Sequence, residues 1–174
     1  MVARNIELLD GFSETNGIQV VNPERMPTSF LRNRGVIISG NNIAAVQNSD
    51  DTKMVIQPGV VFSSSQSPVD IDFTGSAPLM PLSNVTLRVE SSASSSNIRL
   101  FVEMFDYDAN AWVVVHEGPS TTGDTTYNIV RNDWDRWVGP AGQLRAKVRY
   151  KATGPVFAFP WTGRIDWVHW TLND

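Results

Sequence analysis

The chain has no cysteine, and its 174 residues include only two histidines. Without cysteine there is no disulfide framework, no thiol nucleophile and no cysteine-based zinc site. Charged residues are also scarce, at 18% of the chain against about 25% in an average soluble domain. The formal charge of −4 is acidic, whereas proteins that bind nucleic acid or anionic membranes are generally basic. We therefore expect no nucleic-acid partner.

Long apolar runs are absent as well. None approaches the roughly 18 residues that a membrane helix needs, so we expect no membrane insertion. Residues 1–17 lack the apolar stretch of about 7–15 residues that a secretory signal contains, and the sequence as given predicts no signal peptide. There is also no Gly-x-Ser-x-Gly elbow and no phosphate-binding glycine loop. Together with the scarcity of histidine, these absences favour a protein that is not an enzyme and has no cofactor.

Along most of the chain, apolar and polar residues alternate with a period of two, and no window shows convincing helical periodicity. In Gln143–Lys151, apolar residues fall on one face and basic residues on the other, as in a half-buried strand. Such runs predict an all-β, jelly-roll-like antiparallel sandwich of two sheets, with about nine to eleven strands and little or no helix. The predicted strands are Gly35–Ile38, Ile43–Gln47, Lys53–Gln57, Val69–Phe73, Val85–Ser91, Ile98–Tyr107, Trp112–Glu117, Thr125–Arg131, Gln143–Lys151 and Arg164–Leu172.

The first part of the chain is less regular. Residues 1–27 contain Asn16-Gly17 and two prolines, and they predict an N-terminal arm that packs on its own domain or on a neighbour. Residues 28–174 are predicted to form a single β-sandwich domain. The serine-rich stretches within it are too short to separate domains, and we interpret them as exposed loops.

A basic stripe is the sharpest electrostatic feature. Arg145, Lys147, Arg149 and Lys151 share one face of a predicted strand, where like charges repel unless something opposes them. Acidic residues of neighbouring strands, an acidic protein partner or an anionic polymer are the three alternatives. Arginine also outnumbers lysine by 11 to 3, which favours protein interfaces because the guanidinium group makes planar bidentate contacts.

Tryptophan is abundant near the C-terminus, where five of the six lie after residue 130. Trp167 and Trp170 differ by three and are predicted on opposite faces of one strand, with Ile165 and His169 on the face of Trp167. A strand with two apolar faces suggests a subunit interface at Trp167 and Trp170. Alternatively, Trp134, Trp137 and Trp161 form an exposed platform that stacks on sugar rings, since a flat indole buries area at small entropic cost. Packing in the core is the third possibility.

Two acidic segments could hold a cation. Asp106, Asp108 and Asn110 match the first ligands of a calcium loop, but Ala111 stands where that loop requires glycine. We prefer to interpret this segment as a polar hairpin turn, so no metal is predicted and Ca²⁺ is kept only as an alternative. The pair Asp50-Asp51 is a second such segment, with a loop cap as the alternative interpretation.

Three passages also carry a resemblance. They are Ser49–Gly59, the hairpin Phe105–Trp112, and Gly154–Trp161 leading to Ile165-Asp166 and Trp170. In this order they resemble a β-sandwich module found near the C-terminus of large secreted or surface proteins of environmental, planctomycete-type bacteria. The resemblance covers residues 35–172 and implies a β-sandwich with a non-catalytic role.

Two functions follow from these observations. The first is a structural protein that self-associates or docks onto a larger assembly, such as a virion decoration, capsid or tail component or a bacterial surface layer. Its partners would be protein, and its place a virion or the outside of a cell. The alternative is a carbohydrate-binding module, whose partner would be a glycan.

Overall fold

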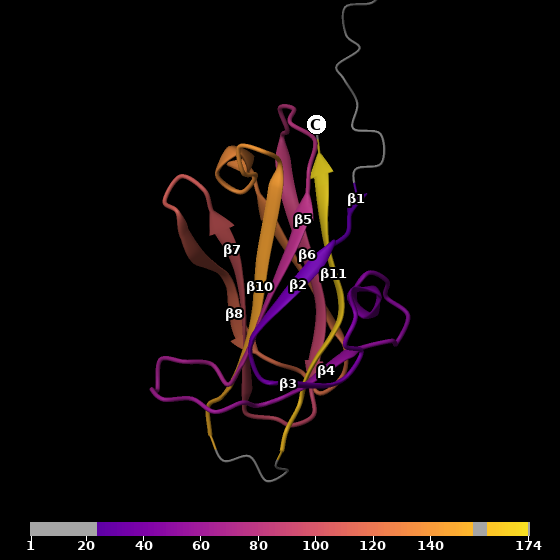
Figure 1. Cartoon of the computed structure of the whole chain (residues 1–174), viewed down its shortest axis with the longest axis vertical. Coiled ribbons are helices and arrows are strands. Elements are labelled where there is room, and N and C mark those ends of the chain that lie inside the picture. The colour runs from indigo at the N-terminus through magenta and orange to yellow at the C-terminus, as the bar shows by residue number, and fades with distance from the viewer. Residues whose placement is uncertain (1–23, 155–159, 174) are drawn as a thin grey trace, which may run out of the picture.

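The computed structural model describes residues 24–154 and 160–173 (Figure 1). These residues form eleven strands and two short 3-10 helices, which confirms the predicted all-β class. The strands are β1 (Glu24–Arg25), β2 (Ser29–Arg34), β3 (Val36–Ser39), β4 (Met54–Gln57), β5 (Val69–Ser76), β6 (Asn84–Ala93), β7 (Ile98–Asp106), β8 (Ala111–Pro119), β9 (Thr125–Arg131), β10 (Gln143–Ala152) and β11 (Gly163–Asn173). The 3-10 helices are η1 (Ile43–Val46) and η2 (Trp134–Arg136). No helix of the described part is long and apolar enough to cross a membrane.

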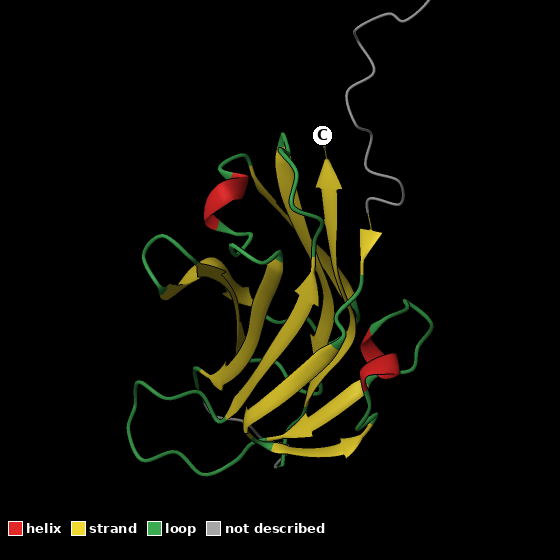
Figure 2. Ribbon diagram, turned by 45° about the horizontal axis from the view of Figure 1, so that its top comes forward, coloured by secondary structure: helices red, strands yellow, loops and turns green. Residues whose placement is uncertain are grey.

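The strands form two antiparallel sheets, and the predicted sandwich is thereby confirmed (Figure 2). One sheet has the order β2-β5-β10-β7-β8. The other has the order β3-β4-β11-β6-β9, with β1 added beside β11. Of the predicted arm, only residues 24–27 lie within the described part. Glu24 pairs with Thr171 and Arg25 with Trp170, so this end of the arm packs on its own domain.

The core lies between the sheets because each strand turns its apolar face inward. The side chains of Phe73, Leu87, Tyr150 and Trp170 are fully buried in it. The hydroxyl of Tyr150, the only polar group of that side chain, donates a hydrogen bond of 2.8 Å to the backbone oxygen of Arg164. The inward face therefore closes the sandwich without leaving that hydroxyl unsatisfied.

Two predictions about individual elements are wrong. Ile43–Gln47 is not a strand, because Asn42 accepts a hydrogen bond from the backbone N–H of Ala45 and starts the 3-10 helix η1. In β11 the register shifts between Ile165 and Trp167, a β-bulge with Asp166 as the extra residue. Ile165 therefore joins the buried core, on the face opposite to Trp167.

Candidate functional site

The outer face of the five-stranded sheet, which points away from the six-stranded sheet, carries an unusual mixture of aromatic and charged side chains. Figure 1 shows strands β7, β10, β5 and β2 of this sheet side by side. Alternation along each strand places apolar residues inward and the others outward, where they are only partly exposed. The outward side chains are Asp70 and Asp72 of β5, Arg145, Lys147, Arg149 and Lys151 of β10, Phe101, Glu103 and Phe105 of β7, and Trp112 of β8.

Acidic residues of the neighbouring strands oppose the basic stripe. Lys147 Nζ lies 3.5 Å from Asp72 Oδ1 and 3.9 Å from Asp70 Oδ1. Arg149 donates to Glu103 and also to the Ser67 hydroxyl, at 3.1 Å for the latter. Of the three alternatives for the stripe, the charge-paired face therefore holds for Lys147 and Arg149. These charges are already partly desolvated, and burial raises the pKa of Asp72.

Arg145, at one end of the stripe, packs on aromatic rings. Its guanidinium lies 4.3 Å from the ring centre of Phe105 and 4.8 Å from that of Trp112. Lys147 Nζ lies 4.4 Å from the Trp112 ring, and Phe105 meets Trp112 edge to face at 5.4 Å. We call Phe105, Trp112, Arg145 and Lys147 the aromatic–cation cluster. Within the described residues Arg145 has no ion pair, and its guanidinium is held by cation–π contacts with the two rings.

The predicted tryptophan platform does not exist in this structure. Trp137 and Trp161 are only 4% and 3% exposed and belong to the core. The Trp137 Nε1–H donates a hydrogen bond of 2.8 Å to Asp133, which fixes the indole in place. The prediction that these two rings are exposed is wrong, because both rings pack against the hydrophobic core of the sandwich.

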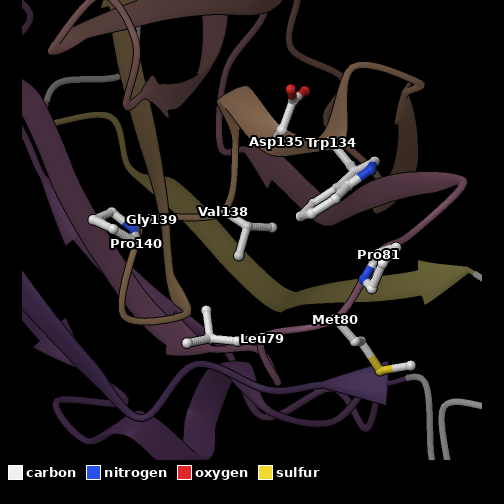
Figure 3. Close-up of a pocket in the computed structure, with 8 residues that line it drawn as sticks. All are labelled: Leu79, Met80, Pro81, Trp134, Asp135, Val138, Gly139 and Pro140. Atoms are coloured by element: carbon white, nitrogen blue, oxygen red, sulfur yellow. The ribbon is translucent and has the colours of Figure 1, made fainter. Parts of the chain in front are cut away.

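Trp134 is half-buried and lines an open cavity of about 390 Å³ (Figure 3). The other lining residues are mostly apolar: Leu79, Met80, Pro81, Val138, Gly139 and Pro140, with Asp135 among them. Figure 3 shows the carboxylate of Asp135 pointing away from Val138 and Leu79. The cavity thus offers apolar contact and few groups that could orient a polar ligand.

The predicted interface pair on β11 divides between core and surface. Trp170 is fully buried, so its assignment to a partner interface is wrong. Trp167 lies on the other face, half-buried, with its ring 3.9 Å from that of His169. Burial and the nearby Arg88 lower the pKa of His169 to about 4. Trp167 remains a predicted partner residue, and His169 is a neutral structural histidine at pH 7.

The segment considered as a calcium loop is a hairpin turn. The buried Asp106 carboxylate accepts hydrogen bonds from the backbone N–H groups of Asp108 and Ala109, at 3.0 and 2.9 Å, and it also binds Arg136. These donors hold the pKa of Asp106 below its usual value. The carboxylate thus organises the β7–β8 turn, as the polar-turn interpretation expects.

Two groupings were not predicted as sites. One is the aromatic–cation cluster, in which the sequence singled out Arg145 and Lys147 as partner residues but neither of the two rings as part of a site. The other is a group of three carboxylates, Asp51, Asp124 and Asp166, that come from distant segments and lie together. Only Asp51 of this group carried a signal in the sequence, as part of the pair Asp50-Asp51. No local pattern could have shown that the other two join it.

A scan against protein-family models found no match, and neither did a search of curated proteins. Among solved structures, the chain is similar to a carbohydrate-binding module of family 29, with 11% identity and a TM-score of 0.41 over 69% of this chain and 68% of that one. It is similar to a CBM4 structure, with 15% identity and a TM-score of 0.37 over 71% and 73% of the two chains. A Ruminococcus gnavus GH29 fucosidase is also similar, with 9% identity and a TM-score of 0.43 over 89% of this chain and 26% of the enzyme. What this chain binds must be inferred from its own side chains.

Proposed function

We propose that the protein is a non-catalytic carbohydrate-binding module whose ligand lies across the outer face of the five-stranded sheet. The observation that carries this proposal is the aromatic–cation cluster beside a row of paired charges. Aromatic rings bind the apolar faces of sugars, and Arg, Lys and Asp bind hydroxyl groups. Here both kinds of group occupy neighbouring strands of one rigid sheet, where their positions are set before a ligand arrives.

Arg145 favours an acidic sugar. Lys147 and Arg149 are each paired with carboxylates, whereas Arg145 has only rings beside it in the described part of the chain. A uronate carboxylate could make a bidentate contact with this guanidinium while its sugar ring packs on Trp112. We therefore propose a polysaccharide containing uronic acid as the ligand, bound outside a cell.

Neither histidine is placed to act on a ligand bound at the outer face. His116 stacks on Tyr127 of the six-stranded sheet, at 4.5 Å between ring centres, and burial lowers its pKa. His169 lies in the six-stranded sheet itself. Neither stands at the outer face beside the cluster, where a general base would have to meet a bound ligand.

Affinity electrophoresis in gels containing polygalacturonate tests the proposal. We expect Trp112→Ala to weaken binding tenfold or more, about 1.4 kcal/mol, because the stacking surface is lost. Val130→Ala is the control, since Val130 is 53% exposed on β9 of the six-stranded sheet and its loss should leave binding unchanged. Equal retardation of wild type and Trp112→Ala would contradict the proposed face.

The preference for an acidic sugar has its own control. Arg145→Gln should weaken binding to polygalacturonate more than to its methyl ester. Arg99→Gln removes a cation from the same sheet that is already paired with Glu117 at 2.8 Å, and it should have little effect. If both variants lose the same affinity, the charge of the face matters and Arg145 has no special role. Release of new reducing ends during incubation would contradict the non-catalytic assignment.

A further inference from the structure

Three carboxylates from distant parts of the chain converge on the six-stranded sheet, at the interior strand β11. Asp51 lies in the loop before β4, Asp124 directly precedes β9, and Asp166 is the bulged residue of β11. One oxygen of each carboxylate lies within 4.8 Å of the other two. Calcium binds oxygens at 2.3–2.6 Å, so opposite ligands stand about 5 Å apart and all three of these oxygens can reach one ion.

Asp166 is the independent observation that points to a ligand. It is only 2% exposed, and its Oδ1 has no hydrogen-bond partner within the described structure. A buried carboxylate without a partner is costly, and native structures rarely keep one unless an ion or another group satisfies it. The β-bulge turns this side chain out of the regular alternation and toward Asp51 and Asp124.

The charges present do not balance. Lys53 Nζ lies 2.5 Å from Asp124 Oδ2 and 3.6 Å from Asp51 Oδ1, so it meets two of the three acids. Arg164 also acts on Asp124, and Glu90 acts on Asp166. Two cations against four carboxylates leave two negative charges, and a divalent cation would neutralise them. The Ser92 hydroxyl donates to the other oxygen of Asp124 at 2.9 Å and holds that carboxylate in its orientation.

We propose that Asp51, Asp124 and Asp166 bind a calcium ion that ties the loop before β4 and the start of β9 to the bulge of β11. Calcium suits the site better than magnesium, because it accepts several carboxylates in irregular geometry, whereas magnesium keeps most of its water. Asp51 is highly exposed and its loop can adjust to the ion, and solvent can complete the coordination from that side. The site is on the other sheet from the aromatic–cation cluster and is independent of carbohydrate binding.

Thermal unfolding of the full chain, with and without calcium, tests this site. After treatment with EDTA, calcium at about a hundred times its Kd should raise the Tm by about 5–10 °C. Asp166→Asn should abolish this rise, and Asp135→Asn, which changes an exposed aspartate in η2, should keep it. Asp166→Asn should also raise the Tm of the calcium-free protein, because it removes a buried unpaired charge.

A direct readout separates binding from stability. Trp167 directly follows Asp166 in the sequence, so terbium bound in place of calcium should luminesce when tryptophan is excited, and added calcium should quench the signal. No calcium-dependent Tm shift at millimolar concentration, or an unchanged shift in Asp166→Asn, would overturn the proposal. An equal shift with magnesium would overturn the assignment to calcium. None of these readouts involves a polysaccharide, so their outcome does not depend on whether the proposed function is correct.

Discussion

At the scale of single residues, the environment decides what a tryptophan does. The sequence predicted Trp170 at a subunit interface and Trp137 in an exposed platform, yet both side chains are buried. Trp112, which the sequence analysis noted only as the end of a hairpin and not as a site residue, stands half-buried on an outer face between two cations. The side chain has the same chemistry in all three places. Only its neighbours determine whether it fills a core or meets a ligand.

His169 is a residue whose role can be tested through pH. It is fully buried, its pKa is lowered to about 4 by burial first and by Arg88 second, and Glu24 acts in the opposite direction. In the unfolded chain the pKa is about 6.5, so the unfolded state binds more protons between pH 6.5 and 4. Neutral His169 therefore favours folding above that window, and its contribution is lost as the pH falls through it.

We expect the free energy of unfolding to fall by up to about 3 kcal/mol between pH 7 and pH 4 because of this group. The measurement is urea unfolding at several pH values for the wild type and His169→Gln. The difference between the two proteins isolates the histidine from the carboxylates that titrate in the same range. A constant difference across the window would show that His169 is not held neutral by the fold.

At the scale of elements, alternation predicted the ends of most strands to within one to three residues. For Thr125–Arg131 the predicted and observed bounds are the same. It failed where a single residue breaks the period. The bulge at Asp166 moves Ile165 into the core and leaves an aspartate buried in an interior strand of the sheet. At η1, one side-chain hydrogen bond from Ala45 to Asn42 outweighs a strand-like apolar run. Such features depend on hydrogen bonds that the apolar pattern does not encode.

The contact between β5 and β11 gives a prediction at this scale. A Cβ at Gly75 would lie 2.8 Å from Cζ3 and 3.2 Å from Cε3 of the buried Trp170 ring. We therefore expect Gly75→Ala to lower the free energy of unfolding by about 1–3 kcal/mol, as overpacking does in closely packed cores. Chemical denaturation measures the change.

Gly123→Ala is the matched control, because nothing lies within 4 Å of the position of its Cβ. It should change the stability by no more than about 0.5 kcal/mol. If Gly75→Ala were as stable as this control, the two sheets would not be packed through Trp170 as the structure shows.

At the scale of the whole molecule, the assembly hypothesis and the proposed carbohydrate site make opposite demands on one face. A ligand face must stay open, so we expect light scattering to give a monomer of about 19.3 kDa across a wide range of concentrations. Trp112 fluorescence, isolated by comparison with Trp112→Ala, should remain accessible to an added quencher at every concentration. A dimer that shields Trp112 would instead favour self-association, which stays a prediction here.

The sequence by itself determined the class of fold, because alternation is local: each strand records which of its faces is buried. It also indicated that something must oppose the basic stripe, since four like charges on one face repel, but it left open whether neighbouring strands, an acidic partner or an anionic polymer does so. It could not determine which residues meet across the sandwich. Asp51, Asp124 and Asp166 are brought together by strand order and a bulge, and Trp112 meets Arg145 only because β7 lies between β8 and β10. Contacts between distant segments depend on sheet order and register, which only the tertiary structure decided.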